Sequence, residues 1–306
     1  PSPTQVLVKV NAVAVNPIDT YVRGGAPPAP QKFPFIVGCD LAGVVEAVGA
    51  DVKQFKPGDR VFGSNQGVLG RQGTFAEYAA VDECWLYRIP DGVPDEQAAA
   101  VALVSITAGI GLLRDSKLAA GETLFINGGS GGVGSMVVQM AKAIGAKVIT
   151  TAGSDAKVKK CLELGAEVAI NYKSQDVAAE IKRVVPGGLN VHWETLRDVD
   201  FDKAIGLMAP RGRMLVMAGR DARPVFPVGP FYLKNLSLHG FTIFGAPPEE
   251  QRACMEKILP WLAAGKIKAC IDRLLPLAKT AEAHKLQEES TIGKSGALAG
   301  KIVLRP

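Results

Sequence analysis

The stretch Asn127-Gly128-Gly129-Ser130-Gly131-Gly132-Val133-Gly134 decides the fold, because it places G-x-G-x-x-G between an apolar segment and an amphipathic one. Residues 123–127 predict a strand and residues 132–144 predict a helix. Glycine at these positions permits a tight turn, close approach of the backbone to a pyrophosphate, and a helix N-terminus whose N–H groups face the anion. A ligand-free Gly-rich turn would share the pattern, but its place at the first turn of an α/β block favours a cofactor site. We predict cofactor contacts at Gly129, Ser130, Gly131, Gly132, Val133 and Gly134.

Strands and helices alternate after this turn. Predicted strands cover 147–151, 168–171, 191–194, 214–217 and 237–244. The predicted helices cover 132–144, 155–164, 175–184 and 202–208. Repeated strand–helix units form a parallel sheet that is covered on both faces. The sequence therefore predicts a doubly wound α/β domain of the Rossmann type.

The chain before residue 95 has a different pattern. Short predicted strands at 6–15, 43–48, 60–62 and 75–81 are separated by turns such as Gly24-Gly25-Ala26-Pro27-Pro28 and Lys56-Pro57-Gly58-Asp59. After a predicted helix at 249–264, short strands return at 271–277 and 301–304, with a helix at 280–288 between them. We predict a mostly β domain over 1–96, the dinucleotide-binding domain over 97–265, and a return to the first domain over 266–306. A strand begins almost immediately after Pro1, so we also expect that the full protein has residues before it.

Composition narrows the class of protein. The chain has 306 residues, 47% of them hydrophobic, and a net charge of +5 with no dense run of Lys or Arg. This pattern argues against nucleic-acid binding. Five scattered cysteines without a C-x-x-C pair indicate a reducing compartment, with the cytoplasm as the default. We expect no membrane span, because no apolar run approaches roughly 20 residues, and we find no signal peptide.

The strand after the glycine-rich turn indicates the cofactor. An acidic residue about 20 positions on usually binds the ribose hydroxyls of NAD and repels a 2′-phosphate. Here the strand ends at Thr150-Thr151-Ala152-Gly153-Ser154 without an acid at its tip. Ser154, Lys157 and Tyr172 are predicted to hold the 2′-phosphate of NADPH. Two alternatives stay open: Ser154 only caps its helix while Lys157 is solvated, or Asp155 selects NAD.

The whole chain resembles the zinc-free quinone oxidoreductases, the zeta-crystallin-like branch of the medium-chain dehydrogenase/reductase superfamily. The motifs that support the resemblance are Asn16-Pro17-Ile18-Asp19-Thr20-Tyr21, Arg23-Gly24-Gly25, Gly38-Cys39-Asp40-Leu41-Ala42-Gly43-Val44-Val45, Lys56-Pro57-Gly58-Asp59-Arg60-Val61, Gly73-Thr74-Phe75-Ala76-Glu77-Tyr78 and Gln139-Met140-Ala141-Lys142. The resemblance implies a GroES-like catalytic domain split around a Rossmann domain, NADPH as cofactor, and a homodimer or homotetramer. It also implies pairing between subunits through the strand at 238–244, for which an ordinary edge strand is the alternative. Family members begin about thirty residues earlier.

Zinc is not expected. A structural zinc site needs clustered thiolates, and residues 61–83 contain no cysteine. By comparison with zinc-dependent relatives, the three catalytic ligand positions fall on Asn16, Cys39 and Leu103. An amide, a thiol and an aliphatic side chain do not form a zinc site, so Cys39 is expected to be a small buried residue.

The resemblance also implies the remaining site residues. Asn16, Asp19 and Tyr21 are expected on the wall of the catalytic cleft, with Asn16 as hydrogen-bond donor to a substrate carbonyl and Tyr21 as proton donor. The alternative is that Asn16 and Asp19 only brace their loop. Thr107, Ala218, Gly219 and Phe244 are expected beside the nicotinamide.

One segment departs from the family pattern. His192 and Trp193 stand where family members commonly have an acid and a small turn, and we expect both to be packed core residues. The alternative is that they lie beside the cofactor.

These expectations predict an NADPH-dependent reductase of quinones or small α,β-unsaturated carbonyls. The alternatives are an enoyl-thioester reductase on the same framework, and a catalytically silent protein that binds NADPH or nucleic acid.

Overall fold

The computed structural model describes residues 1–25, 32–293 and 295–306, so Ala26, Pro27 and Pro28 of the predicted turn lie outside the described residues. The chain divides into two compact units: the first comprises Pro1–Ile106 and Glu256–Pro306, the second Thr107–Met255. These boundaries fall inside α2 (Asp95–Gly109) and α8 (Pro248–Ala263), whereas the sequence placed them at 96/97 and 265/266. Composition marks where a helix begins, but not the turn at which its packing partners change.

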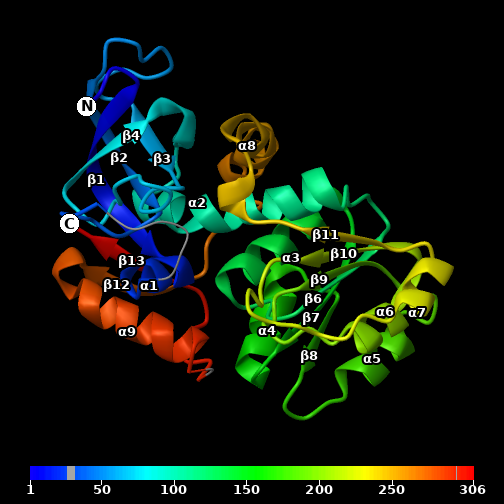
Figure 1. Ribbon diagram of the computed structural model, residues 1–306. Helices are drawn as coiled ribbons and strands as arrows, with labels where there is room; N and C mark the ends of the chain where they lie inside the picture. Colours follow the sequence, from blue (N-terminus) through cyan, green and yellow to red (C-terminus); the bar gives the residue numbers. More distant parts are fainter. Residues whose placement is uncertain (26–31, 294) are drawn as a thin grey trace. The chain divides into compact units, whose positions relative to one another are not determined.

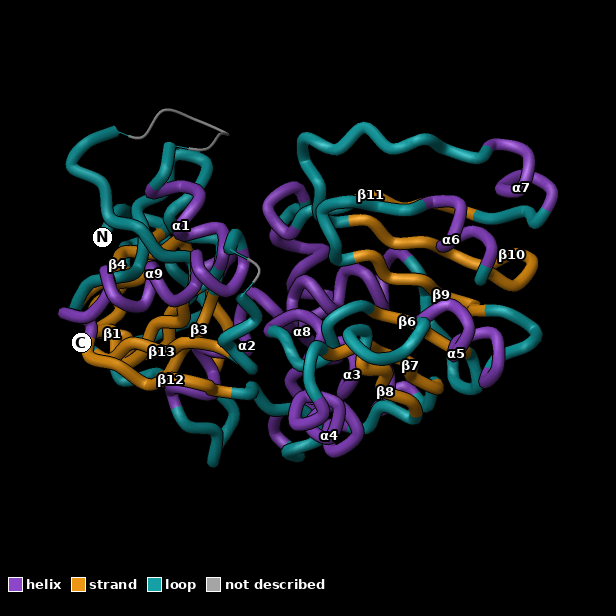
Figure 2. Tube along the Cα trace, turned by 90° about the horizontal axis from the view of Figure 1, so that it is seen from below, coloured by secondary structure: helices purple, strands orange, loops and turns teal. Residues whose placement is uncertain are grey.

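The second unit is built on a parallel sheet. In the described part of the chain its six strands have the order β8-β7-β6-β9-β10-β11, and every neighbouring pair is parallel. Figure 2 shows these strands side by side. The strands are β6 (Thr123–Ile126), β7 (Lys147–Ala152), β8 (Val168–Asn171), β9 (Leu189–Glu194), β10 (Met208–Val216) and β11 (Ser237–Gly240). This order, 3-2-1-4-5-6, is that of a dinucleotide-binding Rossmann sheet and confirms the predicted fold class.

Helices connect the strands of this sheet. They are α3 (Gly132–Ile144), α4 (Asp155–Leu164), α5 (Val177–Val184), α6 (Phe201–Gly206) and α7 (Val228–Leu233), with a π-helical turn, η2 (Ile110–Asp115), and a 3₁₀ turn, η3 (Ile243–Gly245). All four residues of β6 are buried, as expected for a central strand of a sheet covered on both faces. Phe125 of β6 belongs to the same hydrophobic core as Ile149 of β7 and Met214 of β10. The apolar strands thus place the turn after β6 at the carboxyl edge of the sheet.

The first unit is mostly β. Among the described residues, its sheet has the order β12-β13-β1-β2-β3-β5, with β4 also paired to β1. The elements are β1 (Gln5–Val15), α1 (Pro17–Arg23), β2 (Leu41–Val48), β3 (Arg60–Gly63), β4 (Tyr78–Asp82), η1 (Glu83–Trp85), β5 (Leu86–Arg88), β12 (Ile271–Pro276), η4 (Leu277–Lys279), α9 (Thr280–Thr291) and β13 (Lys301–Arg305). Figure 1 shows β1, in blue, beside β13, in red, from the other end of the chain. The fold is that of the expected GroES-like domain.

The first strand shows why this sheet has an apolar core. Val6, Val8 and Val10 alternate with more exposed residues, the period expected of a strand with one buried face. From Ala12 to Val15 every residue is buried, and Val13 to Val15 pair with residues 304 to 302 of β13. The end of β1 is therefore the most enclosed part of the first unit's sheet, and α1 starts from it.

One strand prediction was too long. The structure has β11 over Ser237–Gly240, followed by η3, where a strand over 238–244 was expected. Gly240 pairs with Val216, the last residue of β10, so the ladder ends there. Gln251 Nε2 then donates to the carbonyls of Ile243 and Ala246, 2.8 Å each, which stabilises a turn rather than an extended strand.

The expectation that no apolar run approaches 20 residues was also wrong. Helix α2 continues into η2, which gives a 21-residue helical stretch over Asp95–Asp115 that could cross a membrane by length and composition. Because 83% of its most apolar window is buried inside the structure, this stretch has the burial of a core helix.

Candidate functional site

Residues 127–134, called here the phosphate turn, lie between β6 and α3. Gly128 has φ +70°, a left-handed conformation that favours glycine. Gly131 is the N-cap of α3 and provides no side-chain cap. An uncapped helix leaves N–H groups of its first turn available, and the helix dipole attracts an anion to them. The turn therefore has the donors that a phosphate group needs.

Two glycines of the phosphate turn have no room for a side chain. A Cβ on Gly134 would lie 2.1 Å from the carbonyl oxygen of Gly128, and a Cβ on Gly129 would lie 2.4 Å from Thr150 Oγ1. At Gly131 the nearest atom would be 3.3 Å away. Ser130 is buried, while Gly132 and Val133 are half-buried at the start of α3. Close packing of the turn on itself and on β7 thus explains the first and third glycines of the motif.

Hydrogen bonds hold the phosphate turn from two sides. The amide of Gly128 donates to Thr151 Oγ1, and the amide of Gly129 donates to the carbonyl of Thr151, 3.1 Å each. On the other side Asn127 Nδ2 donates to Glu194 Oε1 at 3.0 Å, and the amide of Leu196 donates to the same oxygen at 2.7 Å. Burial raises the pKa of Glu194. The carboxylate joins the ends of β6 and β9, a role that we did not predict from the sequence.

The tip of β7 brings together the residues predicted to select NADPH. Ser154 caps α4 by accepting a hydrogen bond from the amide of Lys157 at 3.4 Å. A Cβ on Gly153 would lie 2.5 Å from the Tyr172 hydroxyl oxygen, so the Tyr172 side chain covers Gly153 at the tip of β7. Asp155, the residue that kept NAD open, accepts from Asn171 Nδ2 at 2.7 Å. The Asp155 carboxylate, just after the tip of β7, thus accepts a hydrogen bond from a side-chain amide.

The other residues expected near the cofactor are more dispersed. Thr107 is buried in α2, and Ala218 is half-buried beyond the end of β10. Gly219 has φ +81°, and a Cβ there would lie 2.4 Å from the carbonyl oxygen of Arg197. Phe244 is half-buried in η3 instead of in the expected strand. Among these residues, Gly219 is therefore the one at a position where the backbone requires glycine.

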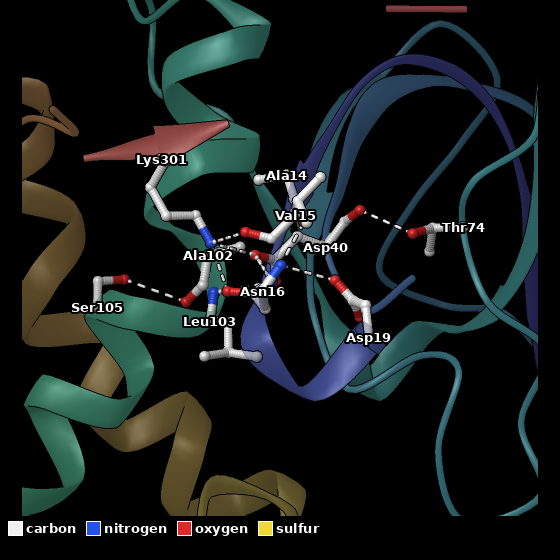
Figure 3. A network of polar contacts seen from close by, with 10 residues as sticks. All are labelled: Ala14, Val15, Asn16, Asp19, Asp40, Thr74, Ala102, Leu103, Ser105 and Lys301. Carbon is white, nitrogen blue, oxygen red and sulfur yellow. Dashed lines mark hydrogen bonds and ion pairs between the residues drawn. The ribbon is translucent and has the colours of Figure 1, made fainter. Parts of the chain in front are cut away.

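A second constellation lies in the first unit and is called here the polar cluster: Asn16, Asp19, Cys39, Asp40 and Lys301. All five residues are at most 5% exposed. Figure 3 shows Asn16, Asp40 and Lys301 pointing toward one another; they lie just after β1, just before β2 and at the start of β13. The cluster thus assembles at the buried end of β1.

The side chain of Asn16 is fully engaged in this cluster. Its Nδ2 donates to Asp40 Oδ2 at 2.8 Å and to the carbonyl of Ala14 at 3.2 Å, and its Oδ1 accepts from Lys301 Nζ. An asparagine amide has two N–H donors, and both are used here. Donation from Asn16 to a substrate would therefore break one of these bonds.

Asp19 is the residue of the cluster whose proton is most easily moved. Burial, and to a smaller extent the charge of Asp40, raise its pKa to about 7 against the hydrogen bond from the amide of Asn16, 2.7 Å. Cys39 shares a hydrogen bond with Asp19, and burial raises the pKa of its thiol. Tyr21, two residues further along α1, is half-buried. Helix α1 therefore carries a buried carboxyl whose pKa lies near neutral pH and, two residues further on, a partly accessible phenol.

Known proteins match the chain over its full length. Residues 2–91 match the alcohol dehydrogenase GroES-like domain and residues 132–263 match the zinc-binding dehydrogenase family. Quinone oxidoreductase from Homo sapiens is 35% identical over 305 residues, which cover 99% of this chain and 90% of that protein. The chain belongs to the quinone oxidoreductase branch of the medium-chain dehydrogenase/reductase superfamily. It is an oxidoreductase.

Solved structures of this superfamily have the same fold. An NAD-dependent alcohol dehydrogenase superposes with a TM-score of 0.89 at 29% identity, covering 100% of this chain and 93% of that one. Quinone oxidoreductase of Escherichia coli complexed with NADPH gives a TM-score of 0.85 at 28% identity with the same coverage. The superfamily thus includes relatives described with either nicotinamide cofactor.

Zinc, which the zinc-binding dehydrogenase description implies, does not fit this member of the quinone oxidoreductase branch. Of the three ligand positions, Asn16 is committed to Asp40 and Lys301, and Leu103 has no ligand atom in its side chain. Cys39 is then the one residue of the three whose side chain could bind zinc, whereas a catalytic zinc site needs three protein ligands. Over residues 1–25, 32–293 and 295–306, no group of three or more His, Cys, Asp or Glu side chains is arranged to hold a metal.

Sequence reasoning missed Asp40 and Lys301 as members of the cluster. Asp40 lies in a quoted motif, but only the folded structure shows that its Oδ1 accepts from the amide of Leu103 in α2 at 3.1 Å. A charged residue at the start of the apolar stretch 301–304 was the available signal for Lys301. The packed state expected of His192 and Trp193 matches their burial, 3% and 0% exposed.

Proposed function

We propose that this oxidoreductase transfers a hydride from NADPH to a quinone or a small α,β-unsaturated carbonyl without zinc. The observation that carries the proposal is the uncapped phosphate turn, in which Gly129 and Gly134 have no room for a side chain. It lies beside the tip of β7, where Asp155 is hydrogen-bonded to Asn171. When bound, NADPH supplies the hydride. The relatives named above support the reaction class.

The selection of NADPH over NADH is proposed to depend on the tip of β7. The Ser154 hydroxyl accepts from the Lys157 amide, which leaves its own hydrogen to donate to a 2′-phosphate. Lys157 provides a cation in the first turn of α4, and the half-exposed Tyr172 borders the same tip. Asp155 Oδ1 accepts from Asn171 Nδ2, which is proposed to weaken the competition of this carboxylate for the ribose hydroxyls.

The first unit is proposed to supply the proton that must follow the hydride. Tyr21 is the candidate donor, because it is the more accessible of the two acids on α1. Asp19 is buried and is proposed to support Tyr21 from the start of the same helix. Asn16 is proposed to orient these groups, since both of its donors are engaged.

The proposal excludes a zinc Lewis acid on the donor set alone. Without zinc to polarise an alcohol, we do not expect oxidation of simple alcohols. We expect reduction of conjugated acceptors such as quinones and enones. An enoyl-thioester reductase is the alternative within the family, and it would need cations for the nucleotide phosphates of its substrate. Comparison of a thioester with the matching free enone separates the two.

We further propose that the protein forms a homodimer in the cytoplasm, and we expect no nucleic-acid or membrane partner. Strand β11 is the edge of its sheet, and Val228, Tyr232, Leu233 and Leu238 beside it are 40% to 72% exposed. Exposed apolar edges favour pairing with another chain. The expected result is a dimeric mass by light scattering, and Leu238→Lys should shift it toward the monomer.

The test of the proposed reaction is a steady-state assay of NADPH oxidation. The full chain is treated with chelator and supplied with 1,4-benzoquinone, 9,10-phenanthrenequinone or a small enone. We expect turnover that the chelator does not change and a kcat/KM for NADPH above that for NADH. NADPH binding without turnover across these acceptors would overturn the reaction and favour the silent alternative.

A further inference from the structure

Lys301 is a buried cation that the proposed reaction has not used. It is the first residue of β13 and is 5% exposed. Buried lysines are rare unless they are paired. Burial lowers the pKa of Lys301 and raises that of Asp40, and the proximity of the two groups opposes both shifts. A charge is therefore held here against its desolvation, which calls for an explanation.

The contacts of Lys301 converge on one point of the chain. Nζ donates to the carbonyl of Val15 at 2.9 Å and to Asn16 Oδ1, and it lies 3.7 Å from Asp40 Oδ2 (Figure 3). Val15 is the last residue of β1, and Asn16 is the N-cap of α1. Both hydrogen bonds go to neutral acceptors, and the carboxylate is the most distant partner. The ammonium thus binds the junction between β1 and α1 more closely than it binds its counter-ion.

Helix α1, which follows this junction, needs contacts with the rest of the protein to be stable. Helix α1 has seven residues, and a helix this short is not stable without tertiary contacts. Its first turn is tied to Asn16 by the hydrogen bond from the Asn16 amide to Asp19 Oδ2. Asn16 is in turn held by Lys301 and Asp40. The direction in which α1 presents Asp19 and Tyr21 therefore depends on the atoms that hold Asn16.

We propose that Lys301 is a positioning residue for the reaction, which fixes the β1–α1 junction so that α1 presents Tyr21 to the substrate and keeps Asp19 in the polar cluster. The inference rests on the proposed function. It differs from a role as simple counter-ion of Asp40, because a counter-ion becomes dispensable when the carboxylate is removed, and a clamp on Val15 and Asn16 does not.

The experiment compares Lys301→Met with the charge-neutral double variant Lys301→Met/Asp40→Asn, and uses the exposed strand residue Lys9→Met as the matched control. Lys301→Met leaves a buried carboxylate unpaired, so its melting temperature should fall by roughly 5 °C or more. The double variant should recover most of that loss. It should nevertheless keep a kcat about 10-fold or more below wild type, because small misplacements of reacting groups have effects of that size. The Kd and KM for NADPH should stay within about twofold of wild type, since the phosphate turn belongs to the other unit.

Hydrogen exchange provides the readout that does not depend on turnover. Amides of α1 should exchange about 10-fold faster in both Lys301 variants, while those of α3 stay at the wild-type rate. Recovery of wild-type kcat or of wild-type α1 exchange in the double variant would overturn the inference. If the wild-type protein reduces no acceptor, the proposed function fails, and the α1 exchange still decides the role of Lys301.

Discussion

The phosphate turn and the polar cluster differ in where their polarity comes from. From Asn127 to Gly134 the turn has no ionisable side chain, and its donors are backbone amides. The cluster removes two carboxyls, a thiol and an ammonium from water. Backbone dipoles do not titrate, whereas buried charges respond to pH and to each other. We therefore expect the polar cluster to be more sensitive to pH than the phosphate turn, which pH reaches through its contact with Glu194.

The largest effect is expected from Asp19→Asn. The carboxyl binds its proton with a pKa of about 7 when folded, against an ordinary value of 3.8, so the folded state holds more protons between these values and stability falls as the pH rises through that range. The full difference amounts to up to about 4 kcal/mol, at about 1.4 kcal/mol for each unit. The variant should be more stable than wild type at pH 8, and the difference should shrink toward pH 4. Urea unfolding at several pH values measures it.

Asp51→Asn, at an exposed position of the same unit, is the control for Asp19→Asn. An Asp19→Asn profile with the wild-type slope would mean that Asp19 is ionised throughout, and the contrast between the two regions would then be lost.

Next in size is Gly131→Asp, which places a carboxylate at the N-cap of α3. The new side chain would compete with a phosphate for the first-turn amides and repel it, so NADPH affinity should fall about 100-fold while the free protein gains at most a few tenths of a kcal/mol. Gly131→Asn offers the same cap without charge and should lose about 10-fold. Calorimetric titration measures both. Unchanged affinity in Gly131→Asp would place the phosphate elsewhere.

Gly134→Ala tests whether close packing of the phosphate turn is required. A methyl group 2.1 Å from the carbonyl oxygen of Gly128 forces the turn apart, and the affinity for NADPH should fall about 30-fold. Gly206→Ala is the matched control, because Gly206 is also helical and has no atom within 4 Å of its Cβ position. Equal affinities in the two variants would show that the geometry of the turn does not determine binding.

The smallest effect is expected from Lys157→Ala, which removes one charge near the tip of β7. NADPH affinity should fall about 10-fold and NADH affinity should stay unchanged, because only NADPH has the 2′-phosphate. Lys159→Ala, at an exposed position on the same helix, should change neither. Equal losses for the two cofactors would reject the phosphate role of Lys157.

The two regions also differ in how far the sequence predicts them. The phosphate turn is eight consecutive residues, so its strand, glycines and helix could all be recognised locally. In the polar cluster Asn16 meets Asp40 from 24 positions away and Lys301 from 285. That meeting depends on the pairing of β1 with β13, which no local pattern contains.

The errors at β11 and α2 have different causes. The apolar residues of 238–244 predicted one strand, but the length of the strand was set by the end of its neighbour β10. We did not predict that α2 and η2 form a continuous 21-residue helical stretch, because the charged residues Asp95 and Asp115 lie at its two termini. At β11 the deciding contact is thus made by a segment that the local sequence does not name.

The pairing of the first and last strands has a consequence for synthesis. The second unit is one uninterrupted stretch, Thr107–Met255, and has all its strands once that stretch has left the ribosome. The sheet of the first unit lacks β13 until residues 301–305 have been added, which is after the whole of Thr107–Met255. Domains generally fold as units as the chain emerges. The nascent chain should therefore carry a folded second unit while β1 is not yet paired with β13. During this interval the unpaired edge of β1 is exposed, and we expect chaperones to bind the chain then.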